Sequence, residues 1–496
     1  MLFNSYTFIF LYLPVVFLGF FWLARTGPIF ATTWLAFASI FFYGYWNPAY
    51  VGLLLASIAF NFIFGTLITK AHHKSPNPSR LYPYKKRLLF FAITANLLLL
   101  GYYKYVNFFI SGINEIAATD WSLGEIILPL GISFFTFTQI AFLVDAYQGK
   151  VKEYSFVHYT LFVTYFPHLL AGPVLHHSEL MPQLQHQKNY HIDWENVAAG
   201  LLLFTLGLCK KTLLADQFSP YADAVFNNAQ NGILLTTYEA WSGALAYTMQ
   251  IYFDFSGYTD MALGIALMFN IRLPINFNSP YKSTSIIEFW RRWHMTLSRY
   301  LRDYLYIPLG GNRKGQFRRY TNLLVTMLLG GLWHGAGWTF ILWGALHGIY
   351  LSINHLWREL IAPKVPFTIP ARISSFVGGA LTFVAVVVAW VMFRSHDLAS
   401  AGVMFNAMFR IESLDISFFD VTHGHLLPNT DMSGSFFAKL LLLSLLWIWL
   451  LPTSSQLKLI KGGRLSIFAQ AVATLFFLCL AIDQFGTYSP FLYFQF

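Results

Sequence analysis

The chain has 496 residues, of which 56% are hydrophobic, 19% aromatic and only 11% charged. A typical soluble protein is about 25% charged, so this composition excludes a soluble globule, a disordered chain, a coiled coil and a secreted disulfide scaffold. It predicts a polytopic membrane protein. The net charge of +10 is attributed to basic cytoplasmic loops that fix membrane orientation, since no nucleic-acid-binding signature accompanies it.

The two cysteines do not indicate a disulfide-bonded secreted protein, and the first segment does not resemble a cleaved signal peptide. Cys209 and Cys479 both lie in apolar runs, which excludes a disulfide framework and a CxxC metal site. Residues 2–24 have no basic n-region and no small-residue cleavage site, so this segment is interpreted as a retained membrane span.

Apolar runs of membrane-spanning length recur along the whole chain. A hydrocarbon core about 30 Å thick needs about 20 apolar residues in a helix. Roughly 11–13 membrane segments are predicted, some of them split or re-entrant, and the fold class is all-α polytopic. In chain order, the candidates are 2–24, 29–47, 50–68, 88–110, 124–145, 155–175, 197–215, 238–270, 321–356, 373–393, 436–452 and 466–483.

Loop charge predicts the orientation, because basic loops stay on the cytoplasmic side. Residues 69–87 hold six Lys and Arg without an acid, and residues 282–319 hold nine against two acids. Residues 411–435 hold four acids and no Lys or Arg, which is compatible with the outer side. Three spans precede the first basic loop, so the N-terminus is predicted to face outward.

Residues 286–307 differ from the spans, because apolar residues recur there at helical spacing while four arginines occupy other faces. The pattern predicts an amphipathic helix along the cytoplasmic interface. The glycine-rich turn behind it, 310–315, lacks the GxxxxGK[ST] spacing of a phosphate-binding loop, so no nucleotide site is predicted. The apolar positions are Ile286, Trp290, Trp293, Leu297, Tyr300 and Tyr304.

Polar groups at membrane depth are costly and usually face a cavity or a partner. Asp254 and Tyr258 share a helix face in an apolar stretch, so one could hold the other. For Asp254 and Tyr258, a purely structural pair and a role in a functional site both stay open.

A second polar cluster includes Asn276 and Asn278, which lie in a turn that leads into the amphipathic helix. That helix carries His294. A lone interfacial histidine is usually an ordinary polar-face residue.

The third polar cluster is His334, which lies among four glycines in residues 330–338. Glycines let a backbone bend or approach another group closely. A buried imidazole is expected to be neutral and can take a proton from a hydroxyl. The alternative is a core histidine bonded to a carbonyl group. His347, thirteen residues on, would lie off the His334 face of a straight helix and is a weaker candidate. No histidine has zinc spacing, so no metal is predicted. No GxSxG elbow appears, although a Ser–His–Asp triad stays open.

Four stretches, 254–262, 276–281, 289–313 and 332–335, resemble the membrane-bound O-acyltransferase family. They are most similar to its bacterial branch, which O-acetylates alginate and peptidoglycan or transfers D-alanine to teichoic acid. The stretch 293–313 favours the acetylating members. The resemblance extends from residue 3 to residue 496. It implies a single domain over 1–496, with a catalytic core at about 125–360, in which a ring of membrane helices with in-plane helices surrounds a central funnel.

The resemblance also implies the site. His334 matches the invariant histidine expected to be the catalytic base, and His294 matches the second histidine of this branch. Tyr493, in the aromatic motif 491–496, is similar to a tyrosine proposed to relay the acyl group. An aromatic anchor at the membrane interface is the alternative. The residues expected to support the site or bind substrate are Asp254, Tyr258, Asn278, Trp333, Arg291 and Arg292.

The implied function is that of a membrane O-acetyltransferase of the bacterial inner membrane, with a periplasmic N-terminus and no bound cofactor. It would move acetyl from a cytoplasmic thioester, acetyl-CoA, to an exopolysaccharide or peptidoglycan through a periplasmic SGNH-type partner. Two alternatives stay open. One is a D-alanyl transfer protein for teichoic acid. The other is a transporter without acyltransferase activity, against which the lack of internal repeats counts.

Overall fold

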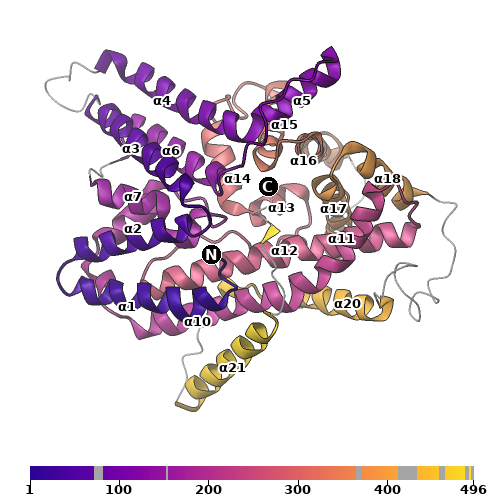
Figure 1. The fold of residues 1–496 in the computed structure, drawn as a ribbon. Helices are drawn as coiled ribbons and strands as arrows, with labels where there is room; N and C mark the ends of the chain where they lie inside the picture. Colours follow the sequence, from indigo (N-terminus) through magenta and orange to yellow (C-terminus); the bar gives the residue numbers. More distant parts are fainter. Residues whose placement is uncertain are drawn as a thin grey trace. The chain divides into compact units, whose positions relative to one another are not determined.

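The computed structural model describes residues 1–71, 82–151, 155–364, 370–410, 433–456, 464–485 and 491–492 (Figure 1). Helices form the regular structure of these ranges, which contain no β-strand. Apolar runs close their backbone hydrogen bonds within the helix, as a lipid environment requires. The predicted all-α membrane fold is confirmed.

The structure supplies ten apolar helices or continuous helical runs among the described residues. Five are long and apolar enough to cross a membrane: Thr7–Ala24, Ala49–Lys70, Lys85–Ala117, Trp194–Gln230 and Ala371–Arg394. Five more are apolar but shorter: Pro28–Gly44, Ile132–Tyr147, Leu398–Phe409, Gly434–Leu450 and Ile467–Asp483.

The chain divides into two compact units, and α12 (Thr237–Met268) contributes to both. The first unit holds residues 1–208, 258–274 and 459–495, and the second holds 209–257, 275–458 and 496. The helices that lie mainly in the first unit are α1 (Leu13–Ala24), α2 (Pro28–Gly44), α3 (Ala49–Lys70), α4 (Lys85–Leu100), α5 (Val106–Ala117), α6 (Ile132–Tyr147), α7 (Phe156–Thr164), α8 (Phe166–Leu169), α9 (His177–Gln185), α10 (Trp194–Cys209) and α21 (Arg464–Asp483).

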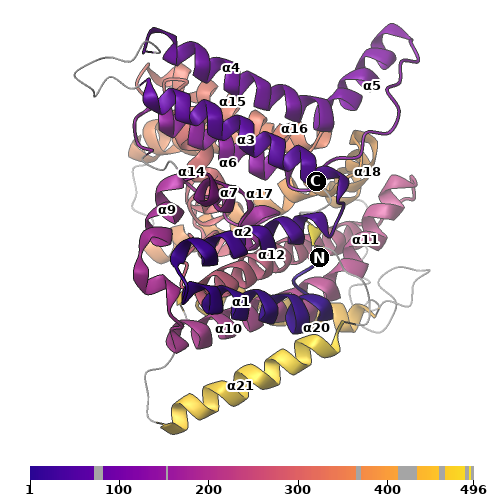
Figure 2. The same cartoon turned by 60° about the vertical axis from the view of Figure 1, so that its left-hand side comes forward.

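Within the first unit, α1 and α2 lie side by side (Figure 2). Buried amides join α3 to α4, where Asn61 and Asn96 donate to each other over 3.0 and 2.7 Å. Amide pairs between apolar helices are a common way to hold a membrane bundle together.

The second unit contains α11 (Asp216–Gln230), α13 (Ile286–Arg292), α14 (Met295–Leu301), α15 (Gln316–His334), α16 (Trp338–Leu356), α17 (Ala371–Arg394), α18 (Leu398–Phe409) and α20 (Gly434–Leu450). Short π- and 3₁₀-helical turns adjoin the helices of both units. They are η1 (Thr7–Tyr12), η2 (Tyr82–Tyr84), η3 (Gly101–Tyr105), η4 (Gln187–Tyr190), η5 (Lys210–Ala215), η6 (Pro280–Lys282), η7 (Arg302–Tyr306), η8 (Trp357–Ile361), η9 (Ala362–Lys364) and η11 (Ser454–Gln456).

Several predicted spans have different bounds in the structure. The candidate 321–356 is two helices, α15 and α16, separated by residues 335–337. The candidate 155–175 contains the short helices α7 and α8, whereas 197–215 is part of the longer run Trp194–Gln230. Hydropathy detects total apolar length, and a break of three small residues leaves that length unchanged.

Candidate active site

His334 is the last residue of α15 and is almost fully buried, at 4% exposure. Its imidazole lies among aromatic rings of α15, α16 and α17. The ring centroids of Trp333 and Trp343 lie 4.9 and 5.2 Å away, and that of Phe393 lies 5.2 Å away. The neutral form of an imidazole can accept a proton from a hydroxyl.

The glycines around His334 allow α15 and α16 to pack backbone to backbone. A Cβ at Gly331 would overlap the carbonyl oxygen of Phe340, and one at Gly344 would overlap that of Met327. A Cβ at Gly335 would overlap the Phe340 ring. The glycine-rich sequence is therefore required for close approach, as expected, and the resulting antiparallel hairpin places His334 at its turn.

His347 lies closer to His334 than helical spacing predicted. The expectation assumed one straight helix, but the chain reverses between the two residues, and His347 is on α16. Trp343 contacts both imidazoles, at 5.2 Å from His334 and 4.9 Å from His347. The Nε1–H of Trp290 donates to Nδ1 of His347 over 3.2 Å, which ties α13 to α16.

The predicted amphipathic helix 286–307 is broken at His294. Helix α13 ends at Arg292, Trp293 is extended, and His294 adopts a left-handed backbone with φ of 42° before α14 starts. Residues 276–278 supply hydrogen-bond partners for backbone groups at the two helix ends that meet at this break. The Asn278 N–H donates to the carbonyl of Arg292, and the Met295 N–H donates to the carbonyl of Asn276, each over 3.0 Å.

His294 is buried, with 1% exposure, and is therefore not the ordinary polar-face residue that a lone interfacial histidine usually is. Its ring contacts Phe255 at 4.7 Å and Trp333 at 6.4 Å between centroids. Trp333 therefore touches both His294 and His334. The segment 286–307 lies outside the candidate membrane spans. Burial lowers the pKa of the His294 imidazole to about 3, so His294 is neutral at physiological pH.

The structure gives Asp254 a partner that helical spacing did not suggest. The Lys211 ammonium lies 2.8 Å from the carboxylates of Asp254 and Asp216, and the side chains of Lys211 and Asp254 are 2% exposed. The sequence did indicate such a pairing, because Lys211 lies in an apolar run and a lysine in that setting needs an acidic partner. Tyr258 belongs to the first unit, where it stacks on Phe3 at 4.9 Å.

The predicted support residues of α13 differ in their surroundings. Arg291 is exposed. Arg292 forms an ion pair with Glu288 at 2.8 Å and donates to the carbonyl of Asn278 over 3.1 Å. Arg292 therefore holds the scaffold around residue 278, whereas Arg291 is accessible to a ligand.

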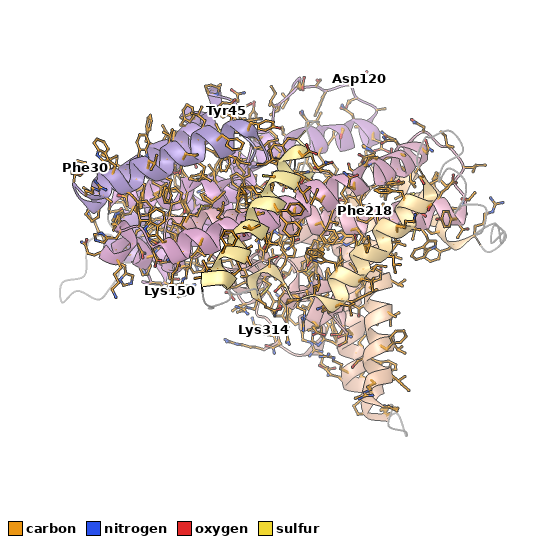
Figure 3. The ribbon with its side chains drawn as sticks, turned by 90° about the horizontal axis from the view of Figure 1, so that it is seen from below. Phe30, Tyr45, Asp120, Lys150, Phe218 and Lys314 are labelled. Carbon is orange, nitrogen blue, oxygen red and sulfur yellow. The ribbon has the colours of Figure 1, made fainter. Side chains whose placement is uncertain are left out.

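Further exposed cations follow in the basic segment 282–319. They are Arg302, Arg313, Lys314 and Arg318 (Lys314 is labelled in Figure 3).

Tyr493 lies outside the described residues. Its neighbour Phe491 is fully buried and packs edge-on against Tyr258 at 5.0 Å. No group of three or more His, Cys, Asp or Glu side chains in the described ranges is placed to hold a metal ion.

Comparison with known proteins identifies the family. Residues 16–394 match the membrane-bound O-acyltransferase family, which is about three-quarters of the chain. The chain belongs to this family. It is therefore an O-acyltransferase and a multi-pass membrane protein, and the glycine-framed, aromatic-lined His334 lies within the matched region.

Relatives in the membrane-bound O-acyltransferase family include enzymes named for acetyl transfer. A peptidoglycan O-acetyltransferase of Helicobacter pylori is 42% identical over 492 residues, 92% of this chain and 90% of that protein. A probable alginate O-acetylase of Pseudomonas aeruginosa is 42% identical, over 84% of this chain and 76% of its own length. A teichoic acid D-alanyltransferase of Bacillus subtilis is 28% identical, over 46% of this chain and 60% of its own length.

The predicted family and enzyme class are confirmed. The single-domain boundaries and the roles of the site residues stay predictions, although the second unit brings His294, Trp333 and His334 together. Two features of the site were not predicted from the sequence: Lys211 is a partner of Asp254, and Asn276 organises the turn at His294.

Proposed function

We propose that this enzyme transfers acetyl groups from acetyl-CoA, at the cytoplasmic face of the inner membrane, to hydroxyl groups of peptidoglycan or an exopolysaccharide. The observation that carries the proposal is the 42% identity to a peptidoglycan O-acetyltransferase, over 92% of this chain. The D-alanyltransferase relatives cover only 46% of it, which disfavours teichoic acid as the acceptor. Membership of an acyltransferase family disfavours a transporter without enzymatic activity.

In the proposed chemistry, His334 acts as a general base. It takes the proton of the attacking hydroxyl as the oxygen attacks the thioester carbonyl and the C–S bond breaks. The proton then passes to the leaving thiolate. His294 orients the hydroxyl or stabilises the charge that develops on the carbonyl oxygen. Positioned proton transfer of this kind contributes about 10²- to 10⁴-fold to a rate.

The donor would approach the basic segment 282–319. The exposed side chains of Arg291, Arg313 and Lys314 would attract the phosphates of coenzyme A, because clustered charge raises the local concentration of an opposite ion. A periplasmic SGNH-type transferase would complete delivery to the polymer. Replacing Arg291 with Ala is expected to raise KM for acetyl-CoA more than it lowers kcat.

Tyr493 is proposed to carry the acetyl group in transit: its phenol attacks the thioester and releases the thiol of coenzyme A, and a hydroxyl of the acceptor then attacks the tyrosyl ester and releases the phenol. A phenol is a poor nucleophile unless a base takes its proton, and His334 would provide that base. Tyr493→Phe should abolish acetyl delivery to the polymer. Full activity of this variant would exclude the relay and leave the base role of His334 intact.

The experiment that tests the proposed function identifies the acyl group and the polymer. Cells that express the full chain, and cells deleted for it, are fed a ¹³C-labelled acetyl precursor, and peptidoglycan and exopolysaccharide are analysed by mass spectrometry. Labelled acetyl esters that depend on the gene are expected on one of the two polymers. Alanyl esters, or ester content that does not depend on the gene, would contradict the proposal.

A further inference from the structure

Asn276 sits at the break that carries His294, and its side chain is fully buried. Its Oδ1 accepts from the Thr296 hydroxyl over 2.7 Å and from the Thr296 backbone N–H over 3.3 Å. Nδ1 of His294 lies 3.4 Å from the same oxygen. Three polar groups of the break therefore converge on one amide.

The orientation of this amide follows from the backbone. The oxygen and nitrogen of an asparagine are assigned from the hydrogen-bond network. A backbone N–H can only donate, so the Asn276 atom that faces Thr296 must be the oxygen. An amide oxygen can only accept, and Nδ1 of His294 must therefore carry the hydrogen.

We propose that Asn276 is a positioning residue that fixes His294 in the tautomer with hydrogen on Nδ1, so that Nε2 is the basic nitrogen of this imidazole. A neutral imidazole carries one hydrogen, and the nitrogen without it is an acceptor. The proton-accepting atom of His294 is thus selected by a residue eighteen positions away in the sequence.

His347 provides an internal comparison, because its tautomer is the opposite one. The indole Nε1–H of Trp290 is a donor only, and it donates to Nδ1 of His347 over 3.2 Å. The hydrogen of a neutral His347 is therefore on Nε2. Of these two buried imidazoles, His294 alone presents a basic Nε2.

The tautomer decides between the two roles left open for His294, and this step rests on the proposed function. In this form Nε2 can accept a hydrogen bond from the attacking hydroxyl but cannot donate one to a developing oxyanion. His294 therefore orients the hydroxyl. The hydroxyl has a single hydrogen to donate. Its hydrogen bond to Nε2 of His294 must therefore be replaced by a hydrogen bond to His334 before His334 takes the proton.

The electrostatic surroundings of His294 make a charge at position 276 informative. Asp254 is paired with Lys211, and Arg292 is paired with Glu288. A carboxylate at position 276 would be a new charge in direct contact with the imidazole. The elements that flank or contact His294 carry, among other titratable groups, Asp254 on α12, Glu288, Arg291 and Arg292 on α13, Arg299 on α14 and His334 on α15.

The direct test is ¹⁵N NMR of the full-length protein in lipid, with histidine rings labelled and the His294 signals assigned by subtracting the spectrum of His294→Gln. A pyrrole-type Nδ1 and a pyridine-type Nε2 are expected. The reverse pattern would overturn the proposal. This readout does not need enzymatic activity, so a protein without acetyl transfer would refute the proposed function and leave the tautomer assignment standing.

Asn276→Asp supplies the second readout. Its carboxylate keeps the acceptor for Thr296 and His294, and its charge favours the imidazolium, so the pKa of His294 should rise. The acid limb of the rate–pH profile should then move upward by about 1 to 3 pH units. Thr296→Val is the matched control, because it removes one bond to the same oxygen and should leave the limb in place. If the acid limb of the rate–pH profile did not move in Asn276→Asp, or moved equally in both variants, the positioning role of Asn276 would be contradicted.

Discussion

At the scale of single residues, Trp333 connects the two histidines of the candidate site. Its indole contacts His334, its neighbour in sequence, and His294, which precedes it by 39 positions. The first contact is implied by the sequence alone. The second depends on how the α13–α14 break packs against α15, which no local pattern specifies. The sequence therefore predicts both histidines but not their association.

The buried ion pair of Asp254 allows a prediction about stability. Asp254→Ala removes one of the two carboxylates that lie 2.8 Å from the buried Lys211 ammonium, and loss of a partner from a buried ion pair costs up to about 3–5 kcal/mol. A large fall in thermal stability of the purified protein is expected. The control is Asp223→Ala, whose carboxylate pairs with Arg394 at 2.7 Å but is 45% exposed. Exposed pairs contribute about 1 kcal/mol or less. Equal losses in the two variants would contradict the assigned role of Lys211.

At the scale of elements, the hairpin of α15 and α16 determines where His334 lies. Its close packing depends on glycine at positions where another residue would overlap the opposite backbone. The sequence predicted this use of glycine correctly. It did not predict the reversal of the chain, because two apolar helices with a short connection have the same hydropathy as one long helix.

Gly344→Ala tests the packing of this hairpin. The added methyl group would overlap the Met327 carbonyl and force α15 and α16 apart, with an expected cost of about 1–3 kcal/mol and a loss of acyl transfer. Gly402→Ala, on α18, is the matched control because no atom lies within 4 Å of the new Cβ. It should leave stability unchanged or raise it by about 1 kcal/mol. A stable and active Gly344→Ala protein would show that the hairpin tolerates separation.

The break at His294 shows why helix continuity was the least predictable feature of the site. The apolar stripe of 286–307 is buried as expected, for example at Trp293 and Leu297. The helix nevertheless stops where residues 276–278 supply partners for the ends of α13 and α14. That contact joins positions 14 to 20 residues apart, beyond the range of a periodic pattern.

At the scale of the whole molecule, composition alone was sufficient to predict a membrane protein, since 11% charged residues cannot cover the surface of a soluble protein of this length. The orientation predicted from loop charge can be tested by cysteine labelling. In a background in which Cys209 and Cys479 are replaced, Asp120→Cys and Asn312→Cys both create an exposed thiol. An impermeant maleimide added to spheroplasts should label position 120 and leave position 312 unlabelled. The reverse pattern would place the basic segment 282–319 outside.

The buried His334 is proposed to be the base of the acetyl transfer. The most direct measurement is the initial rate of acetyl transfer from radiolabelled acetyl-CoA by membranes that contain equal amounts of the wild-type protein and His334→Gln. Glutamine keeps a polar side chain but cannot act as a base. The rate is predicted to fall about 100-fold or more, and a rate equal to that of the wild type would contradict the account.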